Sequence, residues 1–194
     1  MTWSLFDRQG KRKYLTPAER ATVMRGALKQ GGPTGTFCLT LALTGARISE
    51  VLQLTPERID TGTTAVVLET LKRRQRGIFR ALPVPHELIR VLAEVHGLPR
   101  VDKSSRLWPW SRTTAWKRVK SVMKDAGIPA TLAKPRALRH AFGVDAVQNR
   151  IALSLVKKWL GHAKIETTAI YADPIGVEER ALARLMWKRL RADL

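Results

Sequence analysis

Cysteine and acidic residues are scarce in this chain of 194 residues, and each scarcity narrows the class of protein. The chain also has only two tyrosines. The single cysteine, Cys38, lies in the apolar run FCLTLAL, which excludes a disulfide framework and favours a reducing compartment. No Cys/His cluster has zinc spacing, so we expect neither metal nor cofactor. No apolar run approaches ~18 residues, the length expected of a membrane-spanning helix. The N-terminal MTWSLFDRQGKRKY lacks the apolar segment of a signal peptide, and we expect a cytoplasmic protein.

The scarcity of acidic residues leaves the chain strongly basic. There are 35 Lys and Arg against 16 Asp and Glu, a formal charge of +19, which is extreme for an enzyme of neutral metabolites. Such a charge attracts a polyanion, and nucleic acid is the usual one. A membrane surface fits less well, because the basic residues are spread along the chain rather than confined to one amphipathic helix. The hydrophobic content of 44% excludes a disordered chain, and the length suits one domain with a sizeable core or two very small ones.

Helical patterns dominate the chain. Thr16-Pro17-Ala18-Glu19 predicts a capping box, and Gly31-Gly32-Pro33 ends the helix that follows it. The other predicted helices span about 35–43, 47–54, 85–96, 111–126, 136–148, 152–160 and 177–191. Between them, 65–68 and 79–84 predict an antiparallel hairpin, with a third strand at 58–60 and a strongly basic tip. These patterns predict one mainly helical α+β domain with a small antiparallel sheet inserted, and no internal repeat.

Basic residues gather on one helix and at the hairpin tip. The helix 111–126 has an apolar face and a basic face, which taken alone also fits an ordinary solvated helix. Together with the hairpin tip, the set favours contact with phosphates. The predicted DNA-binding residues are Arg73, Arg74, Arg112, Lys117, Arg118 and Lys120.

Three separate segments carry the residues that matter for chemistry. The first, LTGARISEVL, contains Arg47 and Glu50 in the pattern T-G-x-R-x-x-E, and the second, AKPRALRHAF, contains Arg139 and His140 as L-R-H. In the third, LGHAKIETTAIYAD, Tyr171 follows His162 by nine residues. In these motifs, their order and their spacing, the chain resembles the tyrosine recombinases, or phage-type integrases, over about 15–173.

The resemblance implies a set of catalytic residues, and the chemistry agrees with it. Cutting a DNA phosphodiester without a metal requires a nucleophile, cations for the phosphorane and a proton for the leaving 5′-oxygen. Tyr171 would be the nucleophile, and Arg47 and Arg139 would hold the phosphate oxygens with their planar forks. Taken singly, the two arginines also fit helix-end charges that cap carbonyls. His162 would contact the phosphate or assist proton transfer from Tyr171.

Lys72, in the hairpin sequence LETLKRRQRG, occupies the place of the family's general acid. Because Arg73 and Arg74 follow directly, the alignment of this hairpin with the family could shift by a residue or two, and the identity of the general acid is left open. Glu50 would orient active-site groups without touching DNA, and His140 is interpreted as a structural, hydrogen-bonded residue.

One position departs from the family pattern. The family usually has the motif His-x-x-Arg, which ends here at Arg139. At the position of the motif's histidine, this chain has Arg136. With a pKa above ~12, arginine cannot accept a proton at neutral pH, although it can donate hydrogen bonds to the scissile phosphate. A base, if one is needed, would then be His162 or water.

The function implied by the resemblance is site-specific recombination through a 3′-phosphotyrosine. The implied partner is double-stranded DNA, with four subunits on two paired sites and a Holliday junction between exchanges. The free protein would be a monomer or weakly associated, and it would be a nucleoid-associated protein of bacterial, phage or mobile-element type. Two alternatives are a nicking-closing enzyme like the type IB topoisomerases and a DNA-binding accessory protein that does not cut. The predicted divisions are an extension at 1–14, the catalytic domain at 15–174 and a basic helix at 175–194. That helix would contact a neighbouring subunit or its own domain. No room remains for the family's N-terminal helical domain, so we expect a fragment or a single-domain member.

Overall fold

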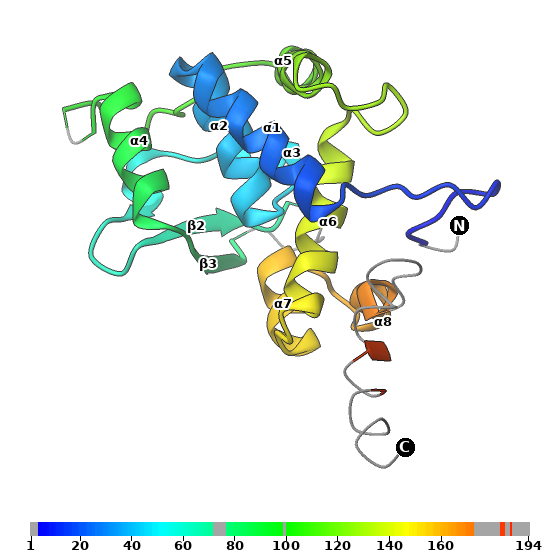
Figure 1. Cartoon of the computed structure of the whole chain (residues 1–194). Helices are drawn as coiled ribbons and strands as arrows, with labels where there is room; N and C mark the ends of the chain where they lie inside the picture. The colour runs from blue at the N-terminus through cyan, green and yellow to red at the C-terminus, as the bar shows by residue number, and fades with distance from the viewer. Residues whose placement is uncertain (1–3, 72–76, 99, 173–182, 185–186, 188–194) are drawn as a thin grey trace.

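The computed structural model describes residues 4–71, 77–98, 100–172, 183, 184 and 187 as a helical body with a small sheet (Figure 1). The helices are α1 Pro17–Gln30, α2 Gly32–Thr44, α3 Ile48–Val51, α4 His86–His96, α5 Arg112–Asp125, α6 Pro135–Gln148, α7 Leu153–Leu160 and α8 Glu166–Ala169, with 3-10 turns η1 Pro56–Arg58 and η2 Ile170–Ala172. The strands are β1 Ile59–Asp60, β2 Ala65–Glu69 and β3 Phe79–Pro83. The predicted mainly helical α+β architecture is confirmed.

The centre of the fold is α2, which is buried along most of its length because its sequence, GPTGTFCLTLALT, is apolar on all sides. It packs against α1, α4, α5 and α6 (Figure 1). Phe37 of α2 meets Trp108 edge to face, with ring centroids 5.1 Å apart. The indole of Trp108 donates a hydrogen bond to the carbonyl of Pro33, so the loop before α5 is held against the start of α2.

The sheet has the order β1-β2-β3, and both pairings are antiparallel. The register places Val66 opposite Leu82 and Leu68 opposite Arg80. On β3, burial alternates, so that Arg80 and Leu82 face inward. An arginine therefore occupies an inward position of an otherwise ordinary amphipathic strand. The tip of the predicted hairpin, 72–76, lies outside the described residues.

A second, smaller core encloses both tyrosines of the chain. Its buried members come from both ends of the described chain and from α6 and α7: Leu5, Tyr14, Val144, Ala146, Val156, Leu160 and Tyr171. An isolated antiparallel bridge between Phe6 and Arg12 folds the N-terminal segment back on itself, and Leu5 lies next to this bridge. The segment predicted as an extension therefore contributes to the core around Tyr171.

Local signals in the sequence set most helix ends. The predicted capping box is present: Thr16 accepts a hydrogen bond from the amide of Glu19, and the Glu19 carboxylate accepts one from the amide of Thr16. Helix α2 begins at Gly32, earlier than predicted, because Pro33 is tolerated in a first helical turn. The predicted helix 177–191 lies almost wholly outside the described residues. Over the described ranges, no helix combines the length and hydropathy needed to cross a bilayer.

Candidate active site

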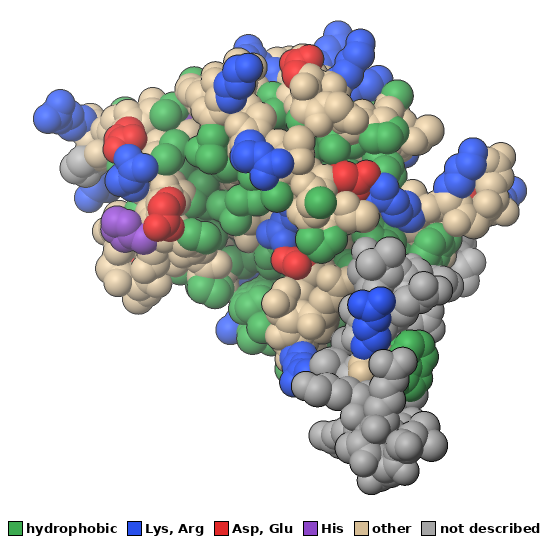
Figure 2. Space-filling model, in the orientation of Figure 1, with side chains coloured by type: hydrophobic (Ala, Val, Ile, Leu, Met, Phe, Trp, Pro, Cys, Tyr) green, Lys and Arg blue, Asp and Glu red, His purple; other side chains and the backbone are tan. Residues whose placement is uncertain are grey.

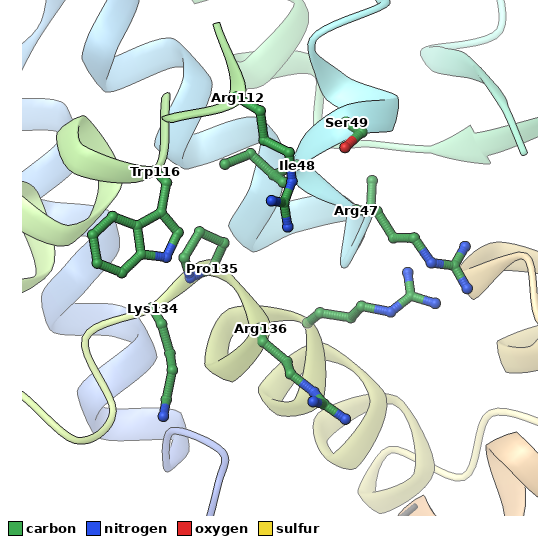
Figure 3. A pocket seen from close by; sticks show the side chains of 10 residues that line it. Arg47, Ile48, Ser49, Arg112, Trp116, Lys134, Pro135 and Arg136 are labelled. Carbon is green, nitrogen blue, oxygen red and sulfur yellow. The ribbon is translucent and has the colours of Figure 1, made fainter. Parts of the chain in front are cut away.

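A basic pocket of about 390 Å³ opens where α3, α5 and α6 approach one another (Figure 3). Five of its ten described lining residues are Lys or Arg, and none of those ten is acidic. Figure 3 shows that the side chains of Arg47, Arg112 and Arg136 come from different elements around this pocket. The lining residues are Ala46, Arg47, Ile48, Ser49, Arg112, Trp116, Lys134, Pro135, Arg136 and Arg139. Such a pocket suits an anion with several oxygens, because arginine forks match phosphate geometry.

Arg139 is the most deeply buried of these cations. Its two terminal nitrogens donate to the carbonyls of Gly45 and Leu160, at 2.8 and 2.7 Å. It therefore does cap helix ends, those of α2 and α7. No described residue accepts a hydrogen bond from its Nε, which leaves one donor on a pocket-lining side chain. Burial, and then the charge of Arg47, lower the pKa of Arg139 to about 10, so it stays charged at neutral pH.

Arg47 is held by Glu50, one turn later in α3. The Glu50 carboxylate accepts hydrogen bonds from the Arg47 guanidinium at 2.8 Å and from its backbone amide at 2.9 Å. Its other contact is Arg80, whose terminal nitrogen lies 2.7 Å away. Burial alone would raise the pKa of Glu50, but the charges of Arg80 and Arg47 lower it, so the carboxylate is ionised. Glu50 thus orients Arg47 from outside the pocket.

Arg80 links three elements, and the sequence patterns did not identify it. Its Nε donates to the carbonyl of Trp159 at 2.8 Å, and one terminal nitrogen donates to Thr70 at 2.9 Å. A methyl group on Gly161 would meet this guanidinium at 3.0 Å, and Gly161 has a left-handed φ of 63°, so the turn after α7 requires glycine. The signal that could have identified Arg80 is an arginine at an inward strand position, which needs a buried carboxylate as partner.

Tyr171 lies in η2 with its side chain completely buried. The short helix α8 and η2 carry it against α6, where its ring packs on Gly143. Burial raises the pKa of the phenol, although the charges of Arg139, Arg136 and Arg47 act in the opposite direction. The hydroxyl is therefore within electrostatic reach of the arginines of the pocket.

His140 is the side chain that contacts the Tyr171 hydroxyl. Its Nδ1 lies 3.3 Å from the phenol oxygen, and its Nε2 accepts a hydrogen bond of 3.1 Å from Nε of Arg136. Positions 136, 139, 140 and 143 share one face of α6, because helical neighbours recur at three and four residues. Burial, and then the charge of Arg136, lower the pKa of His140 to about 3, so the ring is neutral at pH 7.

His162 also lies beside the ring of Tyr171. The two rings are stacked, with centroids 6.2 Å apart and planes at 10°. The Nδ1 of His162 pairs with the hydroxyl of Thr168 in the short helix α8, at 2.9 Å. Burial, followed by the charge of Arg139, lowers the pKa of His162 to about 3. Tyr171 thus has two neutral imidazoles beside its ring.

The predicted DNA-binding residues of α5 do not share one direction. Arg112 lines the pocket and Lys117 is exposed. Arg118 instead lies over the ring of Trp110, 4.4 Å from its centroid, and donates to Thr34 at 2.9 Å. Lys120 lies 5.0 Å from the ring of Trp116, a pocket residue that the sequence patterns missed. Lys72, Arg73 and Arg74 lie outside the described residues.

The side chains described at this site are mainly cations and imidazoles. Within the part of the chain that the structure describes, His, Cys, Asp and Glu side chains form no group of three able to hold a metal ion. The described residues therefore provide a pocket lined by arginine and lysine, a buried phenol and two neutral histidines.

Comparison with known proteins assigns this arrangement to a family and a fold. Residues 13–175 match the model of the phage integrase family. Tyrosine recombinase XerD of Mycobacterium tuberculosis is 33% identical over 176 residues, an alignment that covers 82% of this chain and 56% of the relative. The chain thus spans little more than half the length of that curated relative.

Two solved structures share the fold. The XerA recombinase crystal structure superposes with a TM-score of 0.76 at 21% identity, covering 89% of this chain and 62% of the other. The XerH site-specific recombinase bound to its difH substrate, in a pre-cleavage complex, gives 0.71 at 20% identity, covering 94% and 59%. The predicted recombinase fold is confirmed.

Proposed function

Because this chain belongs to the phage integrase family, we propose that it breaks and rejoins double-stranded DNA at specific sites through a phosphodiester link to Tyr171. The observation that carries the proposal is the pocket in which Arg47, Arg136 and Arg139 meet beside the buried phenol of Tyr171. Three cations on the wall of one pocket suit a phosphorane, which carries more negative charge than the ground-state phosphate. The relative named XerD is a tyrosine recombinase, and the XerH structure holds a DNA substrate.

The proposed reaction is two successive exchanges at phosphorus. The Tyr171 oxygen attacks the scissile phosphorus, the bond from phosphorus to the 5′-oxygen breaks, and the 5′-oxygen takes up a proton. Lys72, on the hairpin, is the proposed proton donor. A 5′-hydroxyl from a second strand then attacks the phosphotyrosine, and the phenol leaves. The link keeps the bond energy, so no nucleotide cofactor is required.

The proposed assembly is four subunits on two DNA sites, with residues 15–174 as the catalytic unit of each. Glu50 is proposed to hold Arg47, while Arg112 contacts flanking phosphates. Arg73, Arg74, Lys117, Arg118 and Lys120 are proposed as further DNA contacts. The exposure of Lys117 and the intramolecular contacts of Arg118 indicate that these contributions differ in size.

The test is a covalent trap without metal. The protein is mixed with sheared source DNA in EDTA, denatured with SDS, and the DNA ends that remain attached are sequenced. We expect adducts from the wild type, none from Tyr171→Phe, and undiminished adducts from Tyr14→Phe, because Tyr14 does not line the pocket and phenylalanine keeps the ring that packs in the core shared with Tyr171.

A nicked substrate, in which religation is blocked, makes the result decisive. Adducts on neither substrate, together with retardation of the same DNA, would replace the proposal with a DNA-binding protein that does not cut. Relaxation of supercoils without strand exchange would instead indicate a nicking-closing enzyme.

A further inference from the structure

We propose that His140 carries its proton on Nδ1 and donates a hydrogen bond to the attacking oxygen of Tyr171, in an orientation that Arg136 imposes. The inference rests on the proposed function, since it assigns a role to residues at the same reacting oxygen. It makes His140 a catalytic residue and Arg136 a positioning residue for it, in addition to any contact of Arg136 with phosphate.

The first step is the tautomer of His140. The Nε of Arg136 is always a donor, and it points at Nε2 of His140 from 3.1 Å. Nε2 must therefore present its lone pair, and in a neutral ring the single proton then resides on Nδ1. The opposite tautomer would place two N–H groups against each other.

The second step is the direction of the hydrogen bond to Tyr171. Nδ1 lies 3.3 Å from the phenol oxygen, and with its proton present it acts as the donor. Burial of the ring and the nearby charges of Arg136, Arg139 and Lys13 all oppose a second proton, which keeps the ring neutral. His140 therefore cannot be the base that removes the phenol proton.

The third step is the consequence for Tyr171. A donor aimed at the oxygen stabilises the phenolate more than the phenol, because a hydrogen bond to a charged acceptor is stronger. This opposes the effect of burial, which raises the pKa of the phenol. During attack the phenol proton leaves to water or to a nonbridging phosphate oxygen, the P–O bond to Tyr171 forms, and the proton of His140 stays on Nδ1.

The fourth step is the choice of arginine. The guanidinium uses Nε for His140 and has two terminal nitrogens besides, on a side chain that lines the phosphate pocket. Lysine has a single head group and cannot occupy both places at once. Arginine at position 136 can therefore hold the imidazole through Nε while its side chain lines the pocket.

The direct test is the tautomer, which is read without any DNA cleavage. Histidine-labelled protein, with the chain intact, is examined by nitrogen NMR, and the His140 signals are assigned by their loss in His140→Asn. We expect protonated Nδ1 and unprotonated Nε2 in the wild type, and loss of this preference in Arg136→Met. A wild-type ring protonated on Nε2, or an unchanged tautomer in Arg136→Met, would overturn the inference.

The second test is the pH dependence of covalent adduct formation on the nicked substrate, with DNA saturating. Removing the donor should move the half-maximal pH upward by about one unit and slow cleavage at neutral pH by about 10- to 100-fold. Arg136→Met and His140→Leu should both show this. His140→Asn should retain most activity, because its amide N–H can occupy the place of Nδ1–H.

A double-variant cycle separates the positioning role from a structural one. In the His140→Asn background the donor no longer depends on a tautomer, so adding Arg136→Met should shift the pH profile less than it does in the wild type. An equal shift in both backgrounds would mean that Arg136 acts on the phosphate alone. The absence of adducts from the wild type would defeat the proposed function, whereas the NMR result stands independently of it.

Discussion

At the scale of single residues, the space around Tyr171 is set by a missing side chain. A methyl group on Gly143 would lie 2.7 Å from three ring carbons of Tyr171, closer than such atoms approach in real structures. Gly143 is inside α6, so its role is the room that it leaves rather than an unusual backbone angle. The depth at which the phenol sits therefore depends on one hydrogen atom in place of a methyl group.

Gly143→Ala is expected to displace the ring of Tyr171 and to lower the free energy of unfolding by about 1–3 kcal/mol, the usual cost of overpacking. In a Tyr14→Phe background, acetylation of the remaining tyrosine, followed by mass spectrometry, should become faster. The control is Gly26→Ala in α1, where the added methyl has its nearest neighbour, Ala126, at 3.4 Å. That variant should match or exceed the parent stability, and equal behaviour of the two variants would contradict the packing argument.

The two neutral histidines make stability depend on pH. Their pKa values of about 3 in the folded protein lie below the ordinary 6.5. The unfolded chain therefore binds more protons between these limits, and the free energy of unfolding should fall as pH drops below 6.5, by at most about 1.4 kcal/mol per pH unit and histidine. Urea denaturation at pH 7 and pH 5 measures the effect.

His162→Asn should reduce this slope, whereas His86→Asn, at an exposed position at the start of α4, should leave it unchanged. A wild-type stability that is flat between pH 7 and pH 5 would show that the imidazoles are not held neutral.

Sequence reasoning identifies the arginines and the tyrosine because each belongs to a short motif with fixed internal spacing. It cannot place the Tyr171 hydroxyl on His140 or the ring on Gly143, since those contacts join α6 to η2 across the fold. Arg80 was missed for the same reason: its carboxylate partner, Glu50, lies thirty residues earlier in the chain.

At the scale of elements, Arg80 fastens β3 to α3 and to the end of α7. The Glu50 carboxylate pairs with Arg80 and also with Arg47 of the pocket. The positions of β3 and of Arg47 therefore depend on the same buried carboxylate. Removing one partner of such a pair leaves the other charge buried and unpaired, which is more costly than removing both.

Arg80→Met is therefore expected to lower the free energy of unfolding by about 3–5 kcal/mol. Combining it with Glu50→Gln should cost less than the sum of the single effects, because the orphaned carboxylate is then absent. Thermal and urea unfolding of the four proteins measure the coupling. Additive single effects would mean that the pair contributes no coupling to the fold.

The elements themselves were largely predictable, because their ends carry local signals. The Thr16 capping box, the Ser111 cap of α5 and the left-handed Gly161 after α7 all act within one turn of the chain. The start of α2 was predicted too late, because Gly31-Gly32-Pro33 both ends α1 and begins α2, and Pro33 is tolerated in a first helical turn.

At the scale of the whole molecule, positive charge is widespread rather than confined to the pocket. Figure 2 shows Lys and Arg side chains scattered over the visible face, with fewer acidic ones among them. The charge of +19 should therefore produce strong binding to DNA of any sequence, while the pocket decides where a phosphate is held.

Arg112→Ala should weaken DNA binding and reduce the slope of log K against log salt by about 1, because one phosphate contact is lost. Filter binding or fluorescence anisotropy across a salt series gives the slope. The matched control is Arg90→Ala: Arg90 is exposed on α4 and already paired with Glu94 at 2.7 Å, so a much smaller change is expected. Equal changes would indicate that DNA does not lie over the pocket.

The small core around Tyr171 also has a consequence for how the protein is made. It joins Leu5 to Tyr171, positions separated by 171 − 5 = 166 residues, so its last buried member is synthesised long after its first. A ribosome that has delivered α1 to α7 has therefore produced the arginine pocket without the side chain proposed to attack the phosphate. Until Tyr171 has been synthesised, a nascent chain would carry the arginine pocket without the proposed nucleophile, so any binding of DNA by such a chain would precede the proposed cleavage.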